Sequence, residues 1–481
     1  MSKHVNKVTA AGLLVALGII YGDIGTSPLY VFNSIIKGRV VDETLILGTL
    51  SLIIWTITLL TTIKYVVMVL RADNRGEGGI FSLFALVRRR KKWLVIPAMI
   101  GGAALLSDGI ITPPISITSA IEGLKELPQF HDLSQNTIVY IVLGIIAIFF
   151  FAQQFGTSSI GKLFGPFMSV WFGMLAILGL VHLSDDFTIF RALNPYYGIR
   201  FLVTYPEGFW LLGAVFLCTT GAEALYSDLG HCGRGNIRIS WIFVKTCLLI
   251  NYFGQGASIL KHHSGKLLDK ATIDAEGINA FYDLMPNWFI VPGVIVATSA
   301  AIIASQAMVS GSFTLISEAI RLNLWPKLKI NYPTEAKGQI FIPAINTLLF
   351  AGCVGVVLFF RESSKMEAAY GLAIITTMFM TTILFANYMV LHRVKPLFIY
   401  VFLTAYVIVE SALMDKFIHG GYITLMIGFL LFSVMYIWYR SRKIKNRYVE
   451  FVRMEEYIPK LEELSNDTSV PKYATHLVYL T

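Results

Sequence analysis

The chain has 481 residues, of which 55% are hydrophobic and 14% are charged, and its mean hydropathy is +0.66. So few charged residues cannot cover so apolar a chain in water, so the composition excludes a soluble globular protein and predicts an integral membrane protein. The net charge of +9 is explained by basic loops on one side of the membrane and indicates no nucleic-acid partner.

Segments long enough to cross a bilayer recur along the whole chain. A transmembrane helix needs about 20 consecutive, mostly apolar residues. Twelve such segments are predicted, near residues 10–35, 45–70, 94–120, 136–155, 162–183, 207–230, 239–260, 287–316, 341–360, 366–391, 396–414 and 420–439. Lys and Arg are more frequent in the loops on one side, led by RRRKKW, and in RSRKIKNR after the last span. The positive-inside rule therefore predicts that both termini are cytoplasmic.

The first span contains a polar stretch, YGDIGTSPLY (residues 21–30). A charge at the bilayer centre costs roughly 2.5–3.5 kcal/mol, so Asp23 needs a partner or a task. Gly22, Gly25 and Pro28 weaken the helix around it. We expect a short unwound section whose carboxylate and carbonyl oxygens replace the water shell of a cation. The alternative is a glycine-lined helix crossing with a hydrogen-bonded aspartate.

The third span contains LLSDGIITPPISITSAIEG (residues 105–123). Asp108, Thr112 and Ser116 are spaced four apart, so they share one face of a helix. The two prolines after Thr112 would free backbone carbonyls beside Asp108. The alternative is a simple proline kink, with the hydroxyls bonded back to their own helix.

The sixth span, LCTTGAEALYSDLG (residues 217–230), also combines a break with an acid. Glu223 follows Thr220 and Gly221 at mid-membrane depth. The first and sixth spans occupy equivalent places in a five-plus-five arrangement. Interrupted segments in corresponding positions predict an inverted-repeat transporter with a site at the midplane.

Three further polar residues lie within predicted spans. Tyr370 is able to offer an oxygen or a ring face to a cation, or to pack as an ordinary helix tyrosine. Lys64 lies near the inner end of its span and is expected to snorkel to the membrane surface. Glu410 lies outside the predicted ten-span core and is assigned to a contact with a partner protein.

The sequence contains no Walker glycine–lysine motif, CxxC pair or GxSxG elbow. A nucleotide-driven pump and a membrane hydrolase are therefore not favoured, and we expect no enzyme activity and no cofactor. The cysteines match no zinc or disulfide spacing and are predicted to be small buried hydrophobes. They are Cys218, Cys232, Cys247 and Cys353.

Five motifs resemble those of the KUP/HAK/KT potassium-uptake family. They are GDIGTSPLY (22–30), RGEGGIFSL (75–83), DGIITPPISITSAIEGL (108–124), TTGAEALYSDLGH (219–231) and VPKYATHLVYLT (470–481). The resemblance implies an all-α polytopic membrane protein with 12 transmembrane helices, a leucine-transporter-like (LeuT-like) 5+5 inverted repeat plus two extra helices. It also implies potassium uptake across the cell membrane, coupled to proton entry.

The fold implied by the resemblance divides the chain into three parts. A ten-helix transport core would span residues 1–391, with repeats at about 10–183 and 207–391. Two additional transmembrane helices would occupy residues 392–440, and residues 441–481 would begin a cytoplasmic C-terminal region. In some family members that region binds cyclic di-AMP and helps to make a homodimer, and both are expectations for this chain.

The resemblance also implies a set of ligands for the transported ion. Potassium-binding positions carried over from the family are Asp23, Tyr30, Asp108, Thr112, Ser116, Thr220 and Tyr370, with Glu223 as the eighth polar position. The ion itself is expected at Asp23, Tyr30, Asp108, Thr112 and Ser116. Tyr30 and the promotion of Tyr370 come from the resemblance, whereas the other six also follow from the membrane acids and their spacing.

The hypothesis is a potassium–proton symporter in which the membrane acids divide two tasks. Asp23 and Asp108 would compensate the charge of potassium, and Glu223, flanked by apolar residues, would carry the proton. The alternatives are an amino-acid-type carrier of the same fold, a potassium channel, and a receptor or scaffold. Three membrane acids favour a cation over a zwitterion, no carbonyl filter is evident for a channel, and a scaffold leaves the buried acids unexplained.

Overall fold

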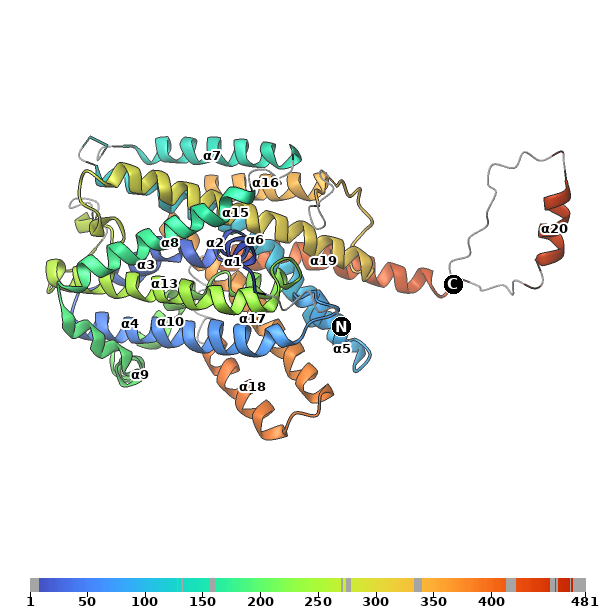
Figure 1. The fold of residues 1–481 in the computed structure, drawn as a ribbon, viewed down its shortest axis with the longest axis horizontal. Helices are drawn as coiled ribbons and strands as arrows, with labels where there is room; N and C mark the ends of the chain where they lie inside the picture. The colour runs from blue at the N-terminus through green and yellow to red at the C-terminus, as the bar shows by residue number, and fades with distance from the viewer. Residues whose placement is uncertain are drawn as a thin grey trace.

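Helices make up the architecture of this protein (Figure 1). The computed structural model describes residues 8–127, 129–130, 133–155, 161–269, 271–273, 278–332, 340–411, 421–449, 455, 457–467 and 469. Within this part the chain forms helices and no β-strand, and three isolated bridges join loop residues. The segment 470–481, which contributes to the family resemblance, lies outside the described residues. So does the segment 412–420, which includes the end of the eleventh predicted span and the first residue of the twelfth.

The longer helices account for most of the bundle. They are α4 (Glu43–Thr56), α6 (Val95–Glu122), α7 (Gln135–Ala152), α8 (Gly161–Leu183), α13 (Arg234–His263), α15 (Ile290–Arg321), α16 (Pro343–Phe360), α17 (Ser363–Leu391), α18 (Pro396–Ser411) and α19 (Gly421–Lys445). Shorter helices are α5 (Ile80–Val87), α9 (Pro195–Thr204), α10 (Gly208–Val215), α11 (Ala222–Ser227), α12 (Leu229–Cys232) and α20 (Ile458–Asn466).

Membrane-spanning character follows from the length and composition of these helices. Among the described residues, nine helices are long and apolar enough to cross a bilayer, or up to ten if one bent pair counts as a single span. Gly208–Thr219 and Pro396–Val407 are shorter apolar helices. The prediction of an all-helical, multi-pass membrane protein is therefore confirmed.

The first predicted span is broken where the glycines and the proline occur. α1 (Ala10–Ile19), capped by the Thr9 side chain, bends by 64° into the following Gly22–Leu29 segment. That segment consists of α2 (Gly22–Thr26) and the 3₁₀ turn η2 (Ser27–Leu29), and α3 (Val31–Ile36) completes the span. A Cβ at Gly22 would lie 2.6 Å from the Cα of Ala304 on α15, so only glycine allows this approach.

The sixth predicted span is broken as well. α10 tightens into a 3₁₀ turn, η9 (Phe216–Thr219), and Thr220 is extended with ψ 145°. Gly221 then adopts φ +76°, a left-handed conformation that favours glycine, and α11 begins at Ala222. The TTG sequence thus ends one helix and starts another.

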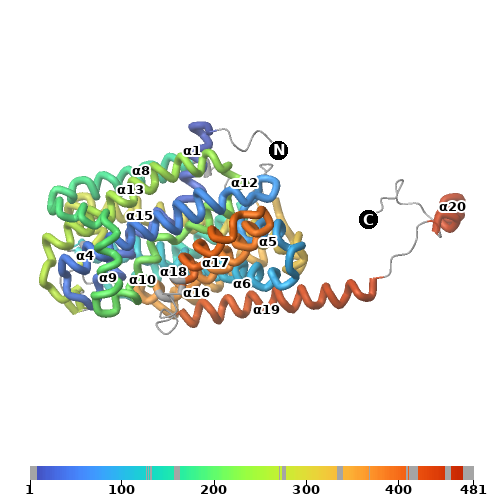
Figure 2. Tube along the Cα trace, turned by 90° about the horizontal axis from the view of Figure 1, so that it is seen from below, coloured from blue at the N-terminus to red at the C-terminus, as the bar shows by residue number. Residues whose placement is uncertain are grey.

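α6 lies at the centre of the bundle and packs against α15, α16, α17 and α19. Its two internal prolines do not end it, since it runs without a break from Val95 to Glu122. Figure 2 shows α19 extending past the end of the bundle at which α5 lies.

After α4 the second span continues as a π-helix, η3 (Ile57–Met68), and ends in the 3₁₀ turn η4 (Val69–Arg71). The Thr62 hydroxyl donates to the carbonyl of Ile57, five residues earlier, at 3.3 Å. π-helical segments are rare and often occur at functional sites. α18 lies against this helix, because the Tyr406 hydroxyl donates to the Leu59 carbonyl at 3.0 Å.

The four cysteines pack as small apolar residues, as the sequence predicts. Each is buried and is a free thiol. The Sγ of Cys353 on α16 lies 3.2 Å from the Ile110 carbonyl oxygen on α6. The thiols therefore contribute to helix packing within the core.

Candidate cation and proton site

Asp23 lies just after the bend of the first span and is 2% exposed. One carboxylate oxygen, Oδ1, accepts a hydrogen bond from the Tyr370 hydroxyl on α17 at 2.6 Å. The other, Oδ2, is buried and has no hydrogen-bond partner among the described residues. A Cβ on Gly221 would be 3.2 Å from this Oδ2, so the break of the sixth span faces the acid of the first.

Three hydroxyls meet beside the two breaks. Ser27 Oγ lies 2.6 Å from Thr220 Oγ1, and the Tyr30 hydroxyl lies 3.4 Å from each of them. The Tyr30 and Tyr370 rings pack edge to face with centroids 6.1 Å apart. Tyr30, Thr220 and Tyr370 thus share one buried polar cluster with Asp23.

The predicted residues of the third span line one face of α6. Thr112 donates to Asp108 Oδ1 at 3.0 Å, as the spacing of four requires. Ser116 Oγ, one turn further on, is buried without a partner in the described part of the chain. α2 and η2 both pack against α6, so this face adjoins the break that carries Asp23.

Much of the broken backbone is satisfied by side chains. The Trp171 indole donates to the Gly25 carbonyl at 2.9 Å, and Gln255 Nε2 donates to the Pro28 carbonyl at 3.1 Å. Irregular backbone at membrane depth needs partners of this kind. In the described chain, Asp23 Oδ2 and Ser116 Oγ are among the buried side-chain oxygens that have no hydrogen-bond partner.

A buried carboxylate oxygen without a donor is unfavourable unless a proton or a cation satisfies it. Carboxylate and hydroxyl oxygens are the ligands that a hard alkali cation accepts in place of water. The oxygens around Asp23 are therefore of the kind that a dehydrated monovalent cation accepts.

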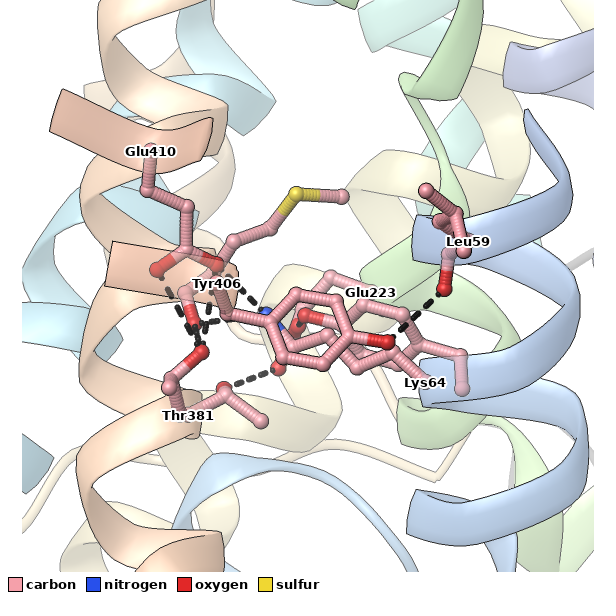
Figure 3. Close-up of polar contacts among 9 residues, drawn as sticks. Leu59, Lys64, Glu223, Thr381, Tyr406 and Glu410 are labelled. Carbon is pink, nitrogen blue, oxygen red and sulfur yellow. Dashed lines mark hydrogen bonds and ion pairs between the residues drawn. The ribbon is translucent and has the colours of Figure 1, made fainter. Parts of the chain in front are cut away.

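Glu223 belongs to a different set of contacts from the other predicted residues. Its Oε1 accepts from the Thr381 hydroxyl on α17 at 2.8 Å, and its Oε2 accepts a short hydrogen bond from the Tyr65 hydroxyl on η3. Figure 3 shows Glu223 in the same group of side chains as Lys64, Thr381 and Glu410. Glu223 is 4% exposed, so its carboxylate is enclosed by protein.

The prediction that Lys64 snorkels is wrong. Its side chain is fully buried, and its Nζ donates to Glu410 Oε1 at 2.7 Å and to the Met378 carbonyl at 3.1 Å. The Nζ also lies 5.2 Å from the ring centroids of Tyr65 and Tyr406. The reason is tertiary: α18 covers this face of η3 and supplies a carboxylate, so Glu410 is committed to an internal ion pair and not to a partner protein (Figure 3).

Three residues that sequence reasoning missed take part in these contacts. Ser27 could have been found, since it lies inside the polar stretch of the first span. Tyr65 and Thr381 carry no local signal, because their importance comes from contact with Glu223, 158 residues away in each case.

A cavity of about 390 Å³ opens near the Asp23 cluster, at the side predicted to be extracellular. Its lining includes the buried residues Tyr30 and Ser119 and the half-buried residues Lys37, Glu122 and Ser364. Glu122 accepts from the Ser363 backbone N–H at 3.1 Å and also from its hydroxyl. The cavity therefore reaches Tyr30, whose hydroxyl belongs to the buried cluster.

A multi-pass helical bundle with buried oxygens between two broken helices has the features of a membrane transport protein. Comparison with known sequences identifies the particular family. A family model described as "K+ potassium transporter integral membrane domain" matches residues 10–443. The chain belongs to this family of potassium transporters, which confirms the KUP/HAK/KT resemblance.

Relatives match over nearly the whole chain. The probable potassium transport system protein Kup of Cytophaga hutchinsonii is 58% identical over 489 residues, covering 99% of this chain and 72% of the relative. The protein of the same name from Flavobacterium johnsoniae is 55% identical over 481 residues, with the same coverage. That from Clostridium perfringens is 52% identical over 493 residues, covering 99% of this chain and 74% of the relative. The family consists of transporters rather than enzymes.

Proposed function

We propose that this chain takes up potassium across the cytoplasmic membrane as a potassium–proton symporter that works by alternating access. Family membership and the names of its relatives support potassium as the substrate. The observation that carries the proposal is Asp23 Oδ2, a buried carboxylate oxygen without a donor among the described residues. Apart from the transported potassium and proton, no cofactor enters the proposal.

The finer architecture is part of the same proposal. The nine apolar helices, the bent pair, and the two shorter apolar helices correspond one by one to the twelve predicted spans. The breaks at Asp23 and at Gly221 face each other, and in the proposed five-plus-five arrangement they would occupy equivalent places in the two halves. Both features support a LeuT-like inverted repeat with two extra helices, and the basic loops support cytoplasmic termini.

Potassium would bind where the two breaks meet the polar face of α6. Asp23 and Asp108 would supply negative charge, and hydroxyls would complete the shell. The hydroxyl ligands proposed are Tyr30, Thr112, Ser116, Thr220 and Tyr370. The contacts of Tyr370 with Asp23 and of Thr112 with Asp108 support this arrangement, because they keep the carboxylates oriented.

Glu223 would carry the proton. Its partners are two hydroxyl groups, and a hydroxyl both donates to a carboxylate and accepts from a carboxylic acid. Glu223 is therefore held in place in either protonation state. The membrane potential then drives two positive charges inward together, at about 2.3 kcal/mol per charge per 100 mV.

The test is reconstitution of the chain in liposomes, recording potassium or rubidium entry with and without an inward proton gradient. The gradient is expected to accelerate ion entry, and Asp23→Asn is expected to abolish ion entry. Glu223→Gln is expected to retain ion binding but to lose the acceleration of entry by the proton gradient. Proton-coupled uptake that survives in Glu223→Gln would remove Glu223 from the mechanism. Currents far above transporter rates would favour a channel, and competition by amino acids would favour an organic-solute carrier.

Homodimer formation and regulation by cyclic di-AMP are proposed from the family resemblance alone. The mass measured by light scattering in detergent tests homodimer formation. Potassium uptake with and without added cyclic di-AMP tests regulation. A monomeric mass would oppose the first, and unchanged uptake with cyclic di-AMP present would oppose the second.

A further inference from the structure

Two buried carboxylates are held by consecutive residues of the same two helices. On η3, Tyr65 donates to Glu223 and Lys64 donates to Glu410. On α17, Thr381 donates to Glu223 at 2.8 Å and Thr382 donates to Glu410 at 3.1 Å. Glu223 and Glu410 are therefore parts of one enclosed cluster, although they come from α11 and α18 (Figure 3).

The charges of this cluster do not balance when every group is ionised. Lys64 contributes one positive charge and Glu223 and Glu410 contribute two negative charges, and all three residues are at most 4% exposed. A net charge in a buried site is strongly unfavourable. One bound proton would make the cluster neutral. Lys64 is paired with Glu410 at 2.7 Å, whereas the hydrogen-bond partners of Glu223 are hydroxyl groups, so Glu223 is the carboxylate to which we assign the proton.

Other titratable groups face α11 from its neighbouring elements. Glu318 on α15 accepts from Ser82. Asp228 immediately precedes α12, His231 lies within it, and His231 Nδ1 is 3.6 Å from Asp228 Oδ1. Asp108 on α6 and Tyr226 on α11 itself also interact electrostatically with Glu223. Lys64 and Glu410 are the charged groups that act most directly on Glu223, one with each sign.

We infer that the Lys64–Glu410 ion pair sets the proton occupancy of Glu223. Through Glu410, α18 thereby adjusts the coupling of proton to potassium transport, although it contributes no ligand to the proposed potassium site. This inference rests on the proposed role of Glu223 as the proton carrier. Lys64 and Glu410 act as positioning residues for the proton: Lys64 favours its release, and Glu410 offsets that effect.

A charge cycle tests the inference. Glu410→Gln leaves Lys64 facing Glu223, so Glu223 ionises more readily, and the external pH of half-maximal rubidium uptake should move to more acidic values by about one unit, or roughly tenfold in proton affinity. Lys64→Met removes the cation and should move that pH in the alkaline direction. The double variant Lys64→Met/Glu410→Gln should return towards the native profile.

Controls separate charge from packing. Thr382→Val removes a hydrogen bond to Glu410 without changing any charge, and it should leave the pH profile unmoved. Lys64→Arg keeps the charge and should stay close to the native profile. Thermal unfolding of each variant in detergent measures how much the pair contributes to stability. A purely structural role of the pair would lower the stability of both single variants without shifting their pH profiles in opposite directions.

The outcomes distinguish the two proposals. If Glu223→Gln abolishes pH-driven uptake while Glu410→Gln and Lys64→Met leave the pH profile unchanged or move it in the same direction, the inference fails and the proposed function stands. If Glu223→Gln retains pH-driven uptake, the proposed proton carrier itself is wrong. Should Lys64→Met fail to insert, the acidic shift in Glu410→Gln and its reversal in the double variant decide the matter.

Discussion

The Tyr370 hydroxyl donates to Asp23 Oδ1 across 2.6 Å, which joins α17 to the break in the first span. One oxygen of the acid is thereby fixed by a protein donor, and the other has no hydrogen-bond partner among the described residues. The two residues are 347 positions apart in the chain, so this contact joins an early and a late segment of the sequence at the candidate site.

Removal of that donor should weaken ion binding. A hydrogen bond to a charged group contributes about 1.5–3 kcal/mol, so Tyr370→Phe is expected to raise the KM for rubidium uptake by about tenfold or more. Tyr252→Phe is the matched control, because the Tyr252 hydroxyl is buried without a partner in the described chain. Equal KM values for the two variants would argue against a role for Tyr370 at the site.

Gly221 should tolerate no side chain. Gly221→Ala puts a Cβ at φ +76° and 2.9 Å from the Ile24 backbone nitrogen, so a loss of stability of about 1 kcal/mol or more is expected, together with reduced uptake. Gly311→Ala on α15 is the control, since nothing lies within 4 Å of the added Cβ. Thermal unfolding in detergent measures both, and an unchanged midpoint for Gly221→Ala would contradict the prediction.

The Lys64–Glu410 pair should show the asymmetry of buried ion pairs. Lys64→Met leaves Glu410 as an uncompensated buried charge and is expected to destabilise the protein by about 3–5 kcal/mol at pH 8. Lys64→Met/Glu410→Gln should recover most of that loss, because neither charge remains. A double variant no more stable than the single one would indicate that packing, and not charge, governs this contact.

A pH effect on stability is expected from the loop that precedes α15. Burial raises the pKa of Asp283 to about 7. A hydrogen bond from the Asn279 backbone favours the ionised form and acts in the opposite direction, but its effect on the pKa is smaller. The folded protein then holds a proton between about pH 4 and pH 7 that the unfolded chain has released, so stability should fall as pH rises through this range.

Asp283→Asn should flatten that pH dependence. His263 Nε2 lies 3.8 Å from Asp283 Oδ2, so the comparison is best repeated in a His263→Asn background. Thermal midpoints between pH 5 and pH 8 provide the measurement. Parallel curves for the native chain and Asp283→Asn would show that this carboxyl does not contribute.

Sequence reasoning reached the breaks and the helical face because both depend on local chemistry. Glycine, proline and an acid within YGDIGTSPLY were enough to predict an interrupted helix around Asp23, where the structure has a 64° bend. A spacing of four placed Asp108 and Thr112 on one helix face, where the structure shows them in contact. The break at Gly221 followed in the same way. The predicted ion ligands remain predictions.

The rest depended on contacts between distant segments. Lys64 was assigned to the membrane surface because its distance from a helix end was the only local information. Its burial follows from the cover that α18 provides through Glu410 and Tyr406. The partners of Glu223 were out of reach for the same reason, since hydroxyls are common in membrane helices and only the fold selects Tyr65 and Thr381.

The burial of every native cysteine has a practical consequence for following the transport cycle. Thiols enclosed between helices are shielded from membrane-impermeant maleimides, so the natural background need not be mutated. A single Ser364→Cys replacement, at a partly exposed position that lines the 390 Å³ cavity, would carry the reactive label. The rate at which this cysteine is modified, with and without potassium, would then report how often the cavity is open to the surrounding water.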